Sequence, residues 1–151
     1  MAELNRREFI IFATGAAAAA VIATPTVALA EANDSAEQIK KFTGGAKVSD
    51  GGIELSMPEI AENGNTVPLS VSIDSPMTDD NHVKSVMVLA EGNPNSGVIT
   101  FNFTPASGKA EASTRMRLAK TQNVTAVARM SDGSFRQTSA LVKVTIGGCG
   151  G

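Results

Sequence analysis

Short runs of alternating apolar and polar residues fill most of the chain after residue 52, and turn-forming residues separate them. Alternation with a period of two predicts half-buried β-strands. The pattern predicts strands over residues 53–57, 66–74, 83–90, 98–104, 112–119, 124–130 and 135–146. About seven short strands at this spacing are typical of an antiparallel β-sandwich of immunoglobulin-like type, so we predict an all-β domain of that class.

Two of these runs predict where their strands lie in a sheet. Residues 83–90 are almost continuously apolar, which favours a central strand. Within residues 66–74, Pro68 has no N–H to donate to a neighbouring strand, so we expect it near the start of its strand or at a sheet edge. Asp132-Gly133 predicts the hairpin turn that leads into the last strand.

A short helix is predicted before the strands, over residues 31–43. Ser35 can cap its first turn, with Gln38 three residues later to complete a capping box. Gly44-Gly45 predicts its end, because glycine readily adopts the left-handed conformation that ends helices.

The first thirty residues resemble an export signal. Arg6-Arg7 precedes an apolar, alanine-rich run from residue 9 to 23, and Ala28-Leu29-Ala30 fits a small-x-small cleavage site. The paired arginines predict export of the folded protein by the twin-arginine route, and therefore a periplasmic location. The apolar run is short for a membrane span, although a retained anchor helix is the alternative. We therefore expect a signal peptide over residues 1–30, a domain over residues 31–146 and an arm over residues 147–151.

Charge and composition exclude some functions. The chain has 13 basic and 15 acidic residues, for a net charge of −2, and no basic cluster. This balance gives no support for nucleic-acid binding, and we expect neither a nucleic-acid partner nor a membrane partner.

The last five residues are Gly147-Gly148-Cys149-Gly150-Gly151, and they contain the only cysteine of the chain. Glycine loses the most backbone freedom on ordering and has no side chain to bury, so four of them predict a flexible arm. Because a single cysteine forms no internal disulfide, it indicates either a reactive thiol or an intermolecular bond. We predict that Cys149 is a site of covalent substrate attachment on a flexible arm of Gly147, Gly148, Gly150 and Gly151.

Catalytic and cofactor-binding patterns are hard to find. The only histidine, His82, lies in a polar stretch that favours a solvated loop, and no nucleophile or phosphate-binding motif is present. The methionines after the signal favour core filling over copper binding; they are Met57, Met77, Met87, Met116 and Met130. Nothing in the arm lowers the pKa of the Cys149 thiol, as a nucleophilic enzyme would require. We therefore expect a carrier that partner enzymes act on, with no metal, cofactor or catalytic residues of its own.

Several stretches together resemble the SoxY family, the substrate-carrying subunits of the bacterial sulfur-oxidising system. These are the arginine pair, residues 57–64 with Val67-Pro68, residues 115–119 and 124–128, Asp132-Gly133, and the terminal Gly-Gly-Cys-Gly-Gly. The resemblance implies an immunoglobulin-like sandwich that forms a heterodimer with SoxZ. It also implies that sulfur intermediates of thiosulfate oxidation are carried covalently on Cys149.

The resemblance further implies three transient partners. A c-type cytochrome, SoxXA, would join thiosulfate oxidatively to the thiol, and the hydrolase SoxB would release sulfate. Where it is present, the sulfane dehydrogenase SoxCD would oxidise the sulfur that remains.

Two alternatives stay open. An exported structural or adhesive β-sandwich would use the cysteine for an intermolecular disulfide. A carrier of the ubiquitin-like kind would instead use the carboxylate after Gly150-Gly151, although such carriers need activation by ATP in the cytoplasm and usually contain a long central helix.

Overall fold

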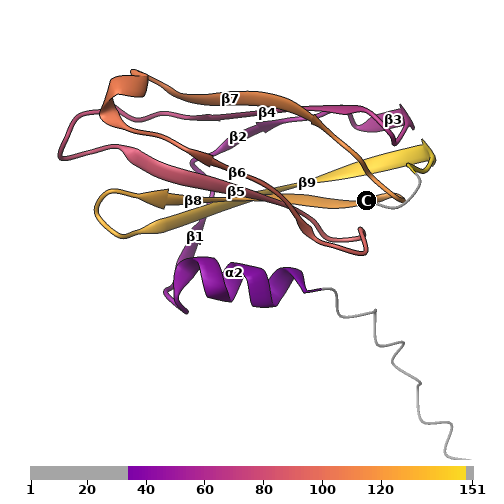
Figure 1. The fold of residues 1–151 in the computed structure, drawn as a ribbon, viewed down its shortest axis with the longest axis horizontal. Coiled ribbons are helices and arrows are strands. Elements are labelled where there is room, and N and C mark those ends of the chain that lie inside the picture. Colours follow the sequence, from indigo (N-terminus) through magenta and orange to yellow (C-terminus); the bar gives the residue numbers. More distant parts are fainter. Residues whose placement is uncertain (1–33, 149–151) are drawn as a thin grey trace, which may run out of the picture. The chain divides into compact units, whose positions relative to one another are not determined.

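A computed structural model describes residues 34–148 of the chain, so the predicted signal peptide lies outside the described residues. These residues form two β-sheets packed face to face, with one helix against the outer face of the larger sheet (Figure 1). The expected all-β sandwich with a short N-terminal helix is therefore confirmed.

The larger sheet has six strands and the smaller sheet three. In the larger sheet the order is β1 (Val48–Asp50), β9 (Phe135–Ile146), β8 (Gln122–Met130), β5 (Val83–Ala90) and β6 (Gly97–Asn102), and β3 (Ile60–Asn63) also pairs with β9. The smaller sheet has the order β2 (Glu54–Ser56), β4 (Val67–Ile73) and β7 (Ala110–Met116). A short 3₁₀ helix, η2 (Pro105–Ser107), lies between β6 and β7.

The sheets are not wholly antiparallel. Strands β1 and β3 both pair with β9 in parallel, whereas the other pairs within the two sheets are antiparallel. Neither β1 nor β3 was predicted, because each is only three or four residues long and lacks a clear alternation. The twelve-residue strand β9 is long enough to pair with β1 near its start and with β3 near its end.

The core lies between the sheets and is built from the alternating residues of the predicted strands. Along β4 every second residue is buried, beginning with Val67 and ending with Ile73, as the period-two pattern predicts. Strand β5 lies between β8 and β6, which confirms its predicted central position. All five methionines named above are buried or pack against this core, so their predicted role as core filling is confirmed.

Pro68 lies near the start of β4, as expected. Strand β2 pairs only with residues 70–72 of β4, so the missing N–H of Pro68 interrupts no pairing with β2. The predicted turn at Asp132-Gly133 is also present, with Gly133 at a φ of 85° and the Asp132 side chain accepting a hydrogen bond from the Ser134 N–H.

Helix α2 (Ser35–Thr43) ends with a recognisable cap, whereas the residue before its first turn makes no capping hydrogen bond with its side chain. The predicted cap Ser35 was wrong by one residue, because the residue at the N-cap position is Asp34. Gly44 ends the helix in the left-handed conformation, as predicted. The Phe42 ring packs edge-on against that of Phe135, with ring centroids 6.1 Å apart, and so joins the helix to β9.

Candidate functional site

The predicted arm begins where β9 ends, at Ile146. The two residues that follow, Gly147 and Gly148, are called the arm base here. Neither lies in a helix or strand, and Gly148 is buried. Cys149, Gly150 and Gly151 lie outside the described residues.

Backbone hydrogen bonds hold the arm base against two loops of the domain. The Gly148 N–H donates to the Leu118 carbonyl over 2.9 Å, and the Leu118 N–H donates to the Gly64 carbonyl over 2.8 Å. The Gly64 N–H in turn donates to the carbonyl of Ile146 over 2.7 Å. These three bonds, which link Gly64, Leu118 and the end of β9, are called the arm clamp here.

Close backbone packing explains why glycine occupies three of these positions. A Cβ on Gly147 would lie 2.2 Å from the Ala119 carbonyl oxygen, and one on Gly64 would lie 2.3 Å from the Leu118 oxygen. A Cβ on Gly148 would lie 2.9 Å from the Gly64 oxygen. Since real Cβ atoms essentially never approach backbone this closely, the clamp closes only with glycine at residues 64 and 147 and is very tight at residue 148.

This arrangement differs from the expectation of a loose arm that begins directly after Ile146. The first two glycines are fitted to the domain, and their lack of side chains allows a close contact. For Cys149, Gly150 and Gly151, flexibility stays a prediction.

The loop at residues 117–121, between β7 and β8, carries Leu118 and is itself well anchored. The Leu118 side chain is fully buried in the core, and the Thr121 hydroxyl accepts a hydrogen bond from the Val144 N–H of β9 over 2.9 Å. The side chain of Asn93 binds the backbone of the same loop on both sides of Leu118. Nothing in the sequence indicated this role for Asn93, which lies in the loop between β5 and β6.

Other candidate residues show no catalytic arrangement. His82 is partly buried, and its Nδ1 lies 3.0 Å from the backbone carbonyl oxygen of Thr78 in the same loop. Between residues 34 and 148 no three histidine, cysteine or acidic side chains are grouped so that they could hold a metal ion. Within the same range, no helix is long and apolar enough to span a membrane.

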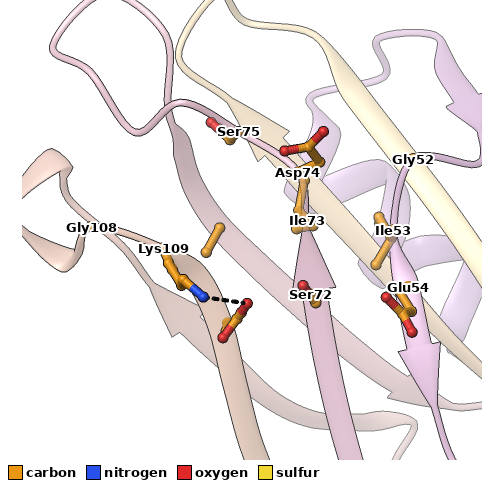
Figure 2. Close-up of a pocket in the computed structure, with 11 residues that line it drawn as sticks. Gly52, Ile53, Glu54, Ser72, Ile73, Asp74, Ser75, Gly108 and Lys109 are labelled. Atoms are coloured by element: carbon orange, nitrogen blue, oxygen red, sulfur yellow. Dashed lines mark ion pairs between the residues drawn. The ribbon is translucent and has the colours of Figure 1, made fainter.

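A cavity of about 700 Å³ opens at the other end of the smaller sheet (Figure 2). Its lining includes Glu54, Asp74, Lys109 and Glu111, and Lys109 pairs with Glu111 at 3.6 Å between Nζ and Oε1. Strand β4 runs from beside the arm clamp to this cavity, a distance of about 20 Å for seven extended residues. Three carboxylates against one ammonium group disfavour an anionic sulfur compound there, so we assign the cavity no part in the arm's chemistry.

Comparisons with known proteins agree with the arrangement of the strands. The model of one family, described as "Sulfur oxidation protein SoxY", matches residues 39–149. A solved structure of the sulfur carrier protein SoxY from Chlorobium limicola f thiosulfatophilum is similar, with 31% identity and a TM-score of 0.63, over 74% of this chain and 96% of that one.

More distant structures share only the fold. A superoxide reductase (neelaredoxin) from Ignicoccus hospitalis has 15% identity and a TM-score of 0.56, over 62% of this chain and 80% of that one. A putative superoxide reductase from Thermotoga maritima has 16% identity and a TM-score of 0.54, over 68% and 89%. The search of curated proteins gave no match.

Proposed function

The chain belongs to the SoxY family of sulfur oxidation proteins, and from this premise we propose that it carries the intermediates of thiosulfate oxidation on Cys149. The observation that carries the proposal is the extent of the family match, which ends at residue 149 and so includes the only cysteine of the chain. The arm clamp supports it, because the clamp fixes the chain as far as Gly148, the residue before the thiol-bearing Cys149.

The chemistry begins with a disulfide bond between protein and substrate. The Cys149 sulfur bonds to the outer sulfur of thiosulfate, which gives a cysteine S-thiosulfonate, releases the thiol proton and yields two electrons. An external electron acceptor takes up these electrons, and the family resemblance assigns this step to the cytochrome SoxXA. The carrier itself supplies one sulfur atom and no redox centre.

Hydrolysis then shortens the adduct. Water attacks the terminal sulfone, the bond between the two outer sulfurs breaks, and sulfate leaves while the sulfane sulfur stays on the cysteine as a persulfide. We assign this step to a hydrolase of the SoxB kind, and further oxidation of the persulfide to SoxCD where that enzyme is present. No step requires a general acid or base on this chain.

Periplasmic export by the twin-arginine route belongs to the same proposal. Thiosulfate and its c-type cytochrome oxidant would then meet the carrier in one compartment. A folded heterodimer is also compatible with this route, which transports folded proteins.

The proposed heterodimer partner SoxZ requires an uncovered surface. Ile60 on β3 and Leu141 on β9 are exposed at 59% and 56%. Ile60 pairs with Lys143, and Leu141 precedes Lys143 by two residues, so Ile60 and Leu141 share one face of the sheet. Large exposed apolar side chains that lie together mark interaction surfaces, and we place the contact with SoxZ on this face of β3 and β9.

Mass spectrometry of the protein after reaction tests the carrier proposal. The heterodimer is incubated with thiosulfate, SoxXA and an electron acceptor, and is then digested and analysed without reductant. We expect a thiosulfate adduct on the peptide that contains Cys149, which disappears when SoxB is added and leaves a persulfide. In the variant C149S, we expect no adduct and no thiosulfate-dependent turnover.

Three other outcomes would contradict the proposal. An obligatory disulfide-linked dimer that takes up no thiosulfate would favour the structural module with an intermolecular disulfide. Sulfur bound at the terminal carboxylate would favour a carrier of the ubiquitin-like kind. Appreciable turnover by C149S would exclude the cysteine as the attachment site.

A further inference from the structure

We propose that Asn93 is a positioning residue for the carrier arm, because its side chain fixes the backbone that holds the arm base. This inference rests on the proposed carrier function. It assigns a role to a residue of the loop between β5 and β6, 56 positions before the cysteine in the sequence.

The side chain of Asn93 makes one hydrogen bond on each side of Leu118. Its Nδ2 donates to the Arg117 carbonyl over 2.9 Å, and its Oδ1 accepts from the Ala119 N–H over 2.9 Å. The residue between these two contacts, Leu118, uses its own N–H to bind Gly64 and its carbonyl to bind Gly148. One amide side chain therefore orients both backbone groups that close the arm clamp.

A second amide side chain supports the first. The Gln122 Nε2 donates to the Asn93 Oδ1 over 2.9 Å and to the Lys120 carbonyl over 3.0 Å, and its Oε1 accepts from the Gly92 N–H over 2.7 Å. Both side chains are buried, each with 6% of its surface exposed. Buried amide networks in which the polar groups are paired are rigid, and they hold a single arrangement of the loop.

The position requires both a donor and an acceptor. Asparagine presents an NH₂ group and a carbonyl oxygen from one short side chain, whereas aspartate has no N–H and alanine has neither group. Truncation to alanine removes the partners of the Arg117 carbonyl and the Ala119 N–H, and unpaired groups of this kind favour a different loop conformation that water can reach. Without these two hydrogen bonds the backbone of Leu118 is held less firmly, and the hydrogen bond from the Gly148 N–H to the Leu118 carbonyl is weakened.

Amide hydrogen exchange and kinetics on one set of variants test the role. In N93A we expect the Gly148 amide to exchange about tenfold faster than in the unaltered protein, beyond any change shared with core amides. N93D keeps the acceptor oxygen for Ala119 but sets a charged carboxylate oxygen against the Arg117 carbonyl oxygen, so we expect the same amide to exchange faster in this variant as well. Asn123, which is exposed on β8, provides the matched control N123A, in which we expect the Gly148 exchange to stay unchanged.

The same variants, paired with SoxZ, are then assayed as substrates of SoxXA and SoxB. We expect the KM for the carrier to rise by about fivefold or more in N93A, because a loosened arm base presents the thiol correctly for a smaller fraction of the time, with kcat nearly unchanged. The variant I73V, which alters the core at the far end of β4, controls for a general loss of stability.

The outcomes separate this inference from the proposed function. If Gly148 exchanges no faster in N93A than in N123A or I73V, Asn93 does not hold the arm base and the inference is wrong. If exchange rises while the KM stays constant, the clamp exists but has no positioning role, which also overturns it. Turnover by C149S would overturn the carrier function while leaving the exchange result intact. If N93A does not fold, N93D alone decides, and unchanged Gly148 exchange in that variant refutes the inference.

Discussion

Replacing Gly147 by alanine adds one methyl group at the point where the chain leaves β9. The new Cβ would lie 2.2 Å from the Ala119 carbonyl oxygen and 3.2 Å from its carbonyl carbon, both of which are backbone atoms and have no rotamer to change. The φ angle of Gly147 is not positive, so alanine is compatible with the local backbone and the clash alone opposes it. We therefore expect G147A to release the arm base from the loop at residues 117–121.

The expected fall in the free energy of unfolding follows from the contacts that are broken when the arm base is released. The hydrogen bond from the Gly148 N–H to the Leu118 carbonyl breaks, which costs about 1 kcal/mol net. Gly148 also loses its buried contacts, which contain no side chain and add at most about another 1 kcal/mol. Because the protein escapes the clash by undocking the arm base, the free energy of unfolding falls by only about 1–2 kcal/mol. Since each 1.4 kcal/mol is a factor of ten, the Gly148 amide should exchange about five- to thirtyfold faster.

Amide exchange followed by NMR, with urea unfolding in parallel, measures both quantities. The matched control is G150A, which makes the same chemical change in the predicted arm but beyond the clamp. If glycine at residue 147 serves only flexibility, G147A and G150A should behave alike. Equal Gly148 exchange in the two variants, or a loss of unfolding free energy far above about 2 kcal/mol in G147A, would refute the argument.

Three further predictions concern changes to residues of the domain. Truncating the fully buried Leu118 to alanine should lower the free energy of unfolding in urea by about 2–5 kcal/mol and also accelerate exchange of the Gly148 amide. Truncation of the equally buried Leu69 should lower the free energy of unfolding and leave Gly148 exchange unchanged. L141D should leave the fold intact by circular dichroism but weaken the pairing with SoxZ by at least about tenfold in titration calorimetry, and unchanged affinity would remove this face from the proposed interface. Hydrogen bonds from Ser96 and Gln38 lower the pKa of Asp34 below its usual 3.8. The ionised carboxylate therefore stabilises the fold above pH 3.8, and this contribution is lost as the pH falls through the lowered pKa. The variant D34N should abolish that part of the pH dependence of the free energy of unfolding, measured in urea.

The sequence was sufficient to predict most of the sandwich because the core strands repeat with a period of two. Val67 to Ile73 and the apolar run of β5 could be placed in the interior from the pattern alone. The short strands β1 and β3 could not, because they are held by pairing with β9, which is a tertiary property. Asp34 was missed as the N-cap because its carboxylate is engaged by Ser96, which is distant in the sequence.

The candidate site, like the fold, could be predicted from the sequence only in part. Cys149 could be proposed from the sequence, because a single cysteine between glycine pairs is a local signal. The clamp could not, since Gly64 and Gly147 meet only after the chain has folded, and glycine in a sequence indicates freedom of the backbone as readily as close packing. Asn93 was missed for a related reason, because its hydrogen-bond partners lie more than twenty residues away.

The clamp changes what the arm must do to reach a partner. With all five residues free, the arm would extend about 17 Å from Ile146, whereas with Gly148 docked the cysteine Cα stands only about 4 Å beyond the clamped residue. A partner enzyme therefore meets the thiol at a fixed place beside the domain and has to bring its catalytic centre within that short reach. Undocking of the arm base would cost only about 1–2 kcal/mol, from one hydrogen bond and a glycine contact, but it would spread the thiol over many positions. For this reason a variant that loosens the clamp, such as N93A, is expected to raise the KM for the carrier rather than lower it.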